Sequence, residues 1–130
     1  MSQIPQQLKY TEDHEWVRTE ADGSVVIGVT DHAQHQLGEL VYVELPEAGR
    51  TVARGDAMAV VESTKAASDV YAPLPGTIVQ GNPALADQPE LVNTDPYGEG
   101  WLVRLRPGDA GDLAALLDSA AYTKLLDAEG

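Results

Sequence analysis

One lysine stands in a short polar patch between two apolar runs. The first run covers residues 57–61 and the second covers residues 70–72, and both are typical of strands. The patch between them is then the tip of a hairpin. Lys65 lies near its middle, and the other two lysines, Lys9 and Lys124, lie near the ends of the chain.

A primary amine on a flexible stem can accept an acyl group if it is held out on a rigid support. The ammonium must first lose a proton, so that the amine can attack an activated carboxyl group. The alternative is a solvated lysine that only keeps the loop soluble, which is the usual state of an exposed lysine. Position alone favours that second interpretation.

The elements around this tip are short. Strands are expected at residues 15–19, 25–29, 40–45, 51–53, 77–80 and 101–105, with an Asp-Gly turn at residues 22–23. A helix at residues 33–37 is capped by Thr30 or Asp31 and ends at Gly38. Residues 84–92 have room for one irregular helical turn. From residue 109 the leucine spacing becomes helical, and Ser119 is the expected cap between two short helices.

The length of 130 residues indicates one domain. Short strands with Gly and Pro turns predict a mostly β sandwich or barrel, with a helical C-terminal extension at residues 109–127. Residues 1–7 are expected to form a mobile tail, and residues 8–130 the domain. Trp16 and Trp101 are assigned to core or edge packing.

The net charge of −13 argues against binding to nucleic acid or to an anionic membrane. It favours basic patches on protein partners. The absence of cysteine excludes disulfides, cysteine metal sites and a protein thiol nucleophile. No apolar run is long enough for a transmembrane helix, and the start resembles neither a signal nor a transit peptide, so a cytoplasmic location is expected.

Other chemistry finds little support. His32 and His35 lie three residues apart near Asp31 and Glu39, but no converging ligand set can be placed, so no metal site is expected. No phosphate-binding loop or nucleophile elbow occurs. A hydrolase would need a pocket of perturbed titratable groups, which the sequence does not assemble.

Five segments, in order, resemble the glycine cleavage system H-protein family. They are YTEDHEWV at 10–17, GVTDHAQ at 28–34, VELP at 43–46, ESTKAASD at 62–69 and NTDPYGEGW at 93–101. The resemblance runs from about residue 8 to about residue 126. For Lys65, the resemblance favours an acyl acceptor over a lysine that is only solvated, because ESTKAASD resembles the family's lipoyl-lysine motif.

The resemblance implies a hybrid barrel-sandwich of the lipoyl and biotinyl type. It implies lipoate attached covalently to Lys65 and a non-catalytic carrier. The carrier takes an aminomethyl group from a pyridoxal-phosphate glycine decarboxylase to an aminomethyltransferase that uses tetrahydrofolate. Its dithiol goes to a flavin-dependent (FAD) dihydrolipoyl dehydrogenase. A lipoyl-transferring or ligating enzyme is a further implied partner.

The resemblance also suggests roles for other residues. Glu62 and Asp69 flank the lysine and are candidates for recognition by the modifying enzyme. Residues similar to those lining the family's cleft for the loaded arm are Asp13, Glu15, His32 and His35. The chain has His35-Gln36 where some relatives have an acid followed by His, which weakens the case for any single histidine contact.

The sequence leaves two other kinds of carrier open. An H-like protein that mainly donates lipoate to other proteins is the alternative function. A biotin carrier is disfavoured, because biotinylated lysines usually lie between two methionines and Lys65 lies between Thr64 and Ala66. A carrier that visits several partners is expected to be monomeric.

Overall fold

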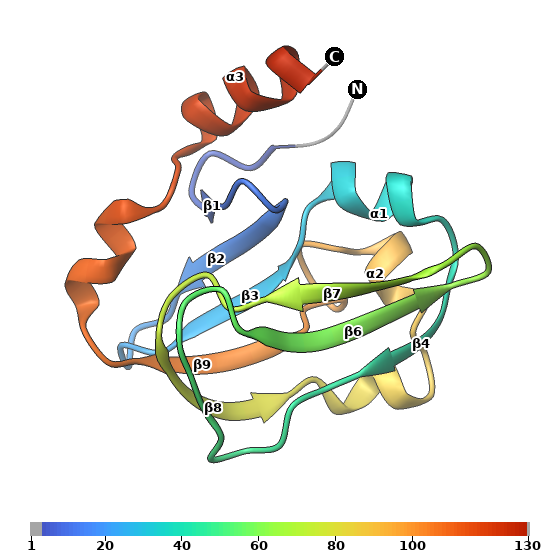
Figure 1. Cartoon of the computed structure of the whole chain (residues 1–130), viewed down its shortest axis with the longest axis horizontal. Coiled ribbons are helices and arrows are strands. Elements are labelled where there is room, and N and C mark those ends of the chain that lie inside the picture. Colours follow the sequence, from blue (N-terminus) through green and yellow to red (C-terminus); the bar gives the residue numbers. More distant parts are fainter. Residues whose placement is uncertain (1–3, 130) are drawn as a thin grey trace.

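The fold is built from two antiparallel sheets, in a computed structural model that describes residues 4–129 (Figure 1). One sheet has six strands in the order β1 (Lys9–Tyr10), β2 (Glu15–Thr19), β3 (Val25–Val29), β9 (Val103–Pro107), β8 (Gly76–Gly81) and β5 (Thr51–Val52). The other has three strands in the order β4 (Leu40–Glu44), β6 (Ala57–Ser63) and β7 (Ala67–Tyr71). The expected mostly β architecture is therefore confirmed.

Short helices connect and cover these strands. They are α1 (Asp31–Leu37), the 3-10 helix η1 (Pro83–Ala86), α2 (Leu91–Thr94), the 3-10 helix η2 (Ala110–Ala115) and α3 (Ser119–Glu129). In the described part of the chain, no helix has the length and apolarity needed to cross a membrane. The expected C-terminal helical segment is present.

The main core lies between the two sheets, and its apolar residues come from most strands. All five residues of β3 are buried, as the continuous apolar run predicts. This follows from the position of β3 inside the larger sheet, between β2 and β9, with both faces covered. The core is built from aliphatic side chains of moderate size, which pack closely in a domain without phenylalanine.

A second apolar cluster fastens the C-terminal helix to the N-terminal strands. Tyr10 and Tyr122 stack with ring centroids 4.6 Å apart, and Trp16, Val26 and Leu8 complete the buried part. The Tyr10 hydroxyl donates to the Pro5 carbonyl. Figure 1 shows α3 beside the N-terminal segment, at a distance from the β6–β7 tip.

Of the predicted tail, residues 1–3 lie outside the described residues. Ile4 packs against the second cluster. The mobility of residues 1–7 stays a prediction.

Several boundaries differ from the sequence-based expectation. The last strand begins at Val103, since Trp101 still belongs to a turn and donates to the Gly98 carbonyl. Residues 84–92 were expected to hold one irregular turn, but η1 and α2 are two separate short helices. The cap before α3 is Asp118, whose Oδ1 accepts from the Ala121 amide, and Ser119 is already helical.

Helix α1 ends at Leu37 as its sequence predicts, but it begins at Asp31, two residues before the expected start. Thr30 is the cap residue and its Oγ1 accepts from the Ala33 amide at 3.2 Å. Gly38 follows the last helical residue with φ of 83°, a conformation that side-chain-bearing residues rarely adopt. The chain then turns directly into β4.

Gly28 is required by its cross-strand partner, Trp16. The two residues are paired between β2 and β3, and a Cβ atom at Gly28 would lie 2.6 Å from carbons of the buried indole ring. The indole Nε1 donates to the Pro96 carbonyl at 2.9 Å, which holds the ring in place. Replacement of Gly28 therefore forces the sheet or the ring to move.

We expect Gly28→Ala to lower the free energy of unfolding by about 1–3 kcal/mol, because the added methyl group overpacks the Trp16 ring. Urea denaturation followed by tryptophan fluorescence measures this. Gly108→Ala is the matched control, since a Cβ atom there meets nothing within 4 Å. Equal stability of the two variants would contradict the packing argument.

Candidate functional site

Lys65 lies at the exposed tip of the β6–β7 hairpin, as the two apolar runs predict. Ser63 organises this tip. Its amide donates to the Ala66 carbonyl at 2.8 Å, and its Oγ accepts from the amides of Lys65 and Ala66 at 3.2 Å each. The Thr64 amide donates to the Glu39 carbonyl at 3.3 Å. The lysine therefore stands on a turn whose backbone is hydrogen-bonded on both sides.

The Lys65 ammonium lies against the end of α1. Its Nζ donates to the Gln36 carbonyl at 3.3 Å. Carbonyl groups at a helix C-terminus attract cations, so this is a favourable resting place for the unmodified amine. A Cβ atom at Gly38 would lie 3.0 Å from Lys65 Cε, so glycine also leaves space for the lysine stem.

A hollow of about 280 Å³ lies beside the tip, between the hairpin and α1. Its lining combines apolar side chains with polar and acidic ones. The lining residues are Asp13, His14, Glu15, Val29, Ala33, Gln36, Leu37, Val61, Ser68, Asp69 and Val70. We call this hollow the hairpin cleft. A lining that is partly apolar and partly acidic suits a long alkyl chain that ends in a polar or positively charged group.

Glu15 is the buried acid of the hairpin cleft, with 2% of its surface exposed. Its Oε2 accepts from the Tyr71 amide at 2.7 Å, and its Oε1 is 3.0 Å from Thr11 Oγ1. Burial raises the pKa of Glu15 to about 7, although both hydrogen bonds act in the opposite direction. Near neutral pH this carboxyl group is therefore able to hold or release a proton.

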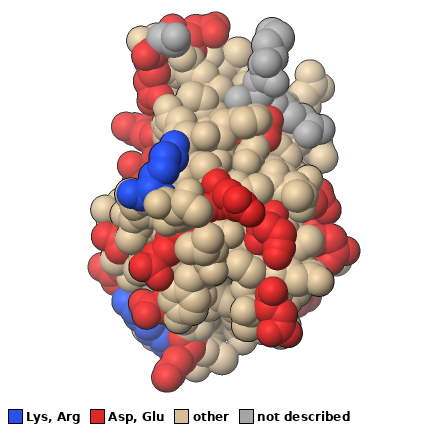
Figure 2. All heavy atoms as spheres, turned by 90° about the vertical axis from the view of Figure 1, so that its right-hand side faces the viewer, with Lys and Arg blue, Asp and Glu red and all other residues tan. Residues whose placement is uncertain are grey.

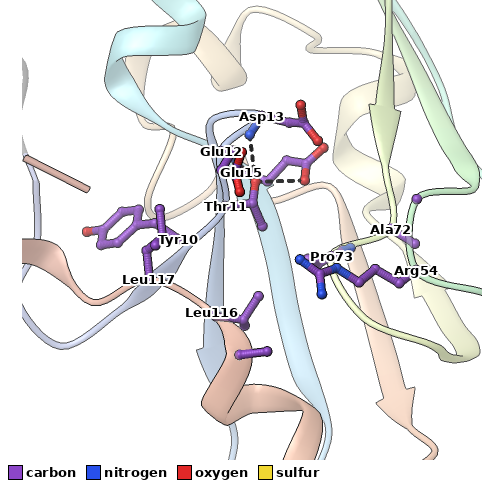
Figure 3. A pocket seen from close by; sticks show the side chains of 12 residues that line it. Tyr10, Thr11, Glu12, Asp13, Glu15, Arg54, Ala72, Pro73, Leu116 and Leu117 are labelled. Carbon is purple, nitrogen blue, oxygen red and sulfur yellow. Dashed lines mark hydrogen bonds between the residues drawn. The ribbon is translucent and has the colours of Figure 1, made fainter. Parts of the chain in front are cut away.

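A second hollow of about 200 Å³ lies on another side of Glu15 (Figure 3). Figure 3 shows Thr11, Asp13 and Glu15 on one side of it and Arg54, Ala72 and Pro73 on the other. Asp13 and Glu15 line both hollows. The two acids therefore mark the place where the hollows approach each other.

The structure brings together some of the predicted site residues and separates others. Asp13, Glu15 and Asp69 line the hairpin cleft. His32 and His35 do not line it: His32 packs against the His14 ring, and His35 lines a different hollow with Glu39 and Asn93.

The two recognition candidates lie on the hairpin itself. Glu62 pairs with Ala67 and Asp69 pairs with Val60, so both side chains are on the outer face of the hairpin near Lys65. Asp69 is exposed and Glu62 is half-buried. Their proposed role in recognition stays a prediction.

Sequence reasoning missed several lining residues. Ser68 and Val70 belong to the cleft because β7 returns past α1, and Gln36 because it lies in the last turn of that helix. The signal for Ser68 was available, since residues 61 and 68 pair across the predicted hairpin. The contact between the hairpin and α1 is a tertiary one and has no local signal.

The face toward which the hairpin tip points is predominantly acidic (Figure 2). Figure 2 shows acidic side chains spread over this face, with basic ones in small areas only. This distribution agrees with the net charge of −13. A partner that approaches the tip meets a negative field, which favours basic surfaces and weakens with salt.

We expect the pH dependence of stability to reveal Glu15. The native pKa of about 7 is above the ordinary value of 4.5, so the native state binds the proton more tightly than the unfolded state. That stabilisation is complete below pH 4.5 and is lost as the pH rises through 7. The free energy of unfolding of Glu15→Gln, minus that of wild type, should increase by about 3 kcal/mol between pH 4.5 and 8.

Urea denaturation at several pH values, with a metal chelator present, measures this difference. The control is Glu12→Gln, which removes a nearby exposed carboxylate and should show a much smaller change. A difference for Glu15→Gln that does not vary with pH would contradict the prediction.

Comparison with known proteins identifies relatives along nearly the whole chain. A family model described as Glycine cleavage H-protein matches residues 8–129. The glycine cleavage system H protein of Halorhodospira halophila is 62% identical over 130 residues, 100% of each chain. That of Cronobacter sakazakii is 54% identical over 129 residues, 99% of this chain and 100% of the other.

A solved structure agrees as well. The crystal structure of a glycine cleavage system H protein from Mycobacterium marinum superposes with a TM-score of 0.86 at 43% identity, covering 95% of this chain and 99% of that one. The expected fold, a barrel-sandwich of the lipoyl type, is thereby confirmed. The fold, the family match and the identities together show that this chain belongs to the glycine cleavage H-protein family, the lipoyl carriers of the glycine cleavage system.

Proposed function

We propose that Lys65 carries lipoate through an amide bond and that the chain is a non-catalytic carrier of the glycine cleavage system. The observation that carries this proposal is the placement of Lys65. It is the lysine at an exposed hairpin tip, and a partly apolar cleft that holds Asp13 and Glu15 begins beside it. A cofactor on this amine is presented to partners and also has a place to return to.

The residues around Lys65 fit the group. Amide formation joins Nζ to an activated carboxyl carbon, while Nζ loses protons and the activating group leaves. The product still has one N–H, which is able to donate to the Gln36 carbonyl in place of the ammonium. A modifying enzyme must first lift the amine from the end of α1. We propose that this enzyme recognises Glu62 and Asp69 on the outer face of the hairpin.

When bound, the lipoyl group supplies a disulfide that accepts a one-carbon fragment and is reduced to a dithiol. An arm on Lys65 reaches on the order of 12–15 Å from its Cα. Val61 and Val70 offer an apolar wall that excludes water from a returning arm. Asp13 and Glu15 place carboxyl groups where a cationic end of the arm would lie.

The chain then shuttles between partners whose active sites do the chemistry. We propose that these partners are glycine decarboxylase, aminomethyltransferase and dihydrolipoyl dehydrogenase. A lipoyl-transferring or ligating enzyme is the proposed partner for the modification. Tethering raises the effective concentration of the arm at each partner. The charge of −13 favours basic docking surfaces on all of them. The cytoplasmic location and the monomeric state stay predictions.

We expect Lys65→Arg to abolish modification. Incubation of wild type with lipoate, ATP and a lipoate ligase should add one lipoyl group, as seen by intact mass, because Lys65 is the lysine held at the tip. Lys124→Arg, a lysine on α3, is the control and should gain one group as wild type does. A gain of mass in Lys65→Arg would show that another amine is the acceptor.

We expect Asp13→Asn to accept lipoate normally and to lower glycine-dependent CO2 release by about tenfold with the purified partner enzymes. The physical reason is the loss of a negative charge at the hairpin cleft. Glu47→Gln lines a different hollow and is the matched control. Unchanged turnover of lipoylated Asp13→Asn would remove Asp13 from the cleft's function but leave Lys65 as the attachment site.

A further inference from the structure

Three possible metal ligands meet at the junction of the N-terminal turn, α1 and the C-terminal helix. His14 lies in the turn before β2, His32 lies in α1, and Glu129 lies at the end of α3. One donor atom from each lies within 4.8 Å of the others. His14 Nε2 is 3.2 Å from Glu129 Oε1. These residues are far apart in the sequence, so the cluster exists only in the folded chain.

The His14 ring is held by an unusual backbone and by a hydrogen-bond chain. Its φ of 67° is the one positive value among described residues other than glycine. Its Nδ1 lies 2.8 Å from the Tyr122 hydroxyl, which in turn lies 2.8 Å from Thr30 Oγ1. With Nδ1 engaged, Nε2 is directed toward Glu129. In metal sites the second imidazole nitrogen is usually fixed by such a partner.

His32 adds an independent observation. Its ring packs against the His14 ring, with centroids 4.7 Å apart and planes 42° apart. Its Nε2 is buried and has no hydrogen-bond partner within residues 4–129. A buried nitrogen without a partner is rare in folded proteins and calls for an explanation. An ion pair between His14 and Glu129 does not explain it, because that pair gives His32 Nε2 no partner.

We propose that His14, His32 and Glu129 bind a divalent transition metal ion, Zn²⁺ above all, and that the ion clamps α3 to the turn before β2 and to α1. Two imidazoles and one carboxylate are a zinc ligand set, with water in the fourth position. Tetrahedral zinc places its ligands about 3.4 Å apart. The His14–Glu129 distance of 3.2 Å is close to this value, and the His32 donor lies within 4.8 Å of both other donors.

The proposed ion is a transition metal because two of the three ligands are imidazoles. Mg²⁺ and Ca²⁺ prefer all-oxygen sites, and two ring nitrogens disfavour both ions. The sequence-based expectation of no metal site considered His32 together with His35, because both lie on the same short helix, α1. The folded chain instead pairs His32 with His14, whose place in the cluster depends on the N-terminal turn.

Isothermal titration calorimetry on the full chain, without an affinity tag and with Lys65 unmodified, tests the proposal. We expect one Zn²⁺ per chain with a dissociation constant in the micromolar range or tighter, and no heat from Mg²⁺. Saturating Zn²⁺ should raise the melting temperature. Co²⁺ should give the visible absorption of a tetrahedral nitrogen–oxygen site.

His32→Asn and Glu129→Gln should each weaken Zn²⁺ binding by at least about tenfold. The matched controls are His35→Asn, an exposed histidine on the same helix as His32, and Asp127→Asn on the same helix as Glu129. Both controls should bind as wild type does. Chelator-treated variants are compared by circular dichroism, so that a change in folding is distinguished from the loss of a ligand.

The absence of Zn²⁺ binding to wild type would overturn the proposal, and the cluster would then be a histidine–carboxylate pair. Equal affinity of wild type and His32→Asn would also overturn it. Loss of binding in His35→Asn would place the ion elsewhere on α1 and contradict this ligand set.

Discussion

The buried carboxyl group of Glu15 is the constraint on which the site depends. It comes from β2 in the six-stranded sheet and accepts from the Tyr71 amide at the end of β7 in the three-stranded sheet. This single hydrogen bond joins the two layers where the hairpin leaves them. A buried acid is costly, and its raised pKa of about 7 measures part of that cost. The fold retains the group at the wall of the hairpin cleft.

The hairpin separates two tasks that a carrier must perform. The Ser63 turn presents Lys65 to solvent on a rigid support, and the strands behind it form one wall of the cleft. Because β7 both supports the tip and lines the cleft, a tethered group has a short path between them. In the proposed function, the chain presents and protects a group that its partners transform.

The C-terminal helix is part of the same arrangement. Tyr122 stacks on Tyr10 and lies within hydrogen-bond distance of both His14 and Thr30, so one side chain connects α3, the N-terminal strands and the cap of α1. His14 also lines the hairpin cleft. An ion held by His14, His32 and Glu129 would therefore stiffen the edge of the cleft from behind. The hairpin tip lies at the other end of α1, where Lys65 Nζ donates to the Gln36 carbonyl.

The sequence alone determined the local elements and the position of Lys65. Alternating and continuous apolar runs identified the hairpin, Thr30 and Gly38 limited α1, and the ESTKAASD segment pointed to Lys65 as the proposed attachment site. These features depend on neighbours within a few residues. The tertiary structure alone placed His32 against His14 and His35 in another hollow, and it buried Glu15 between two sheets. Such contacts join residues far apart in the chain, and no local pattern specifies which side of a short helix meets which turn.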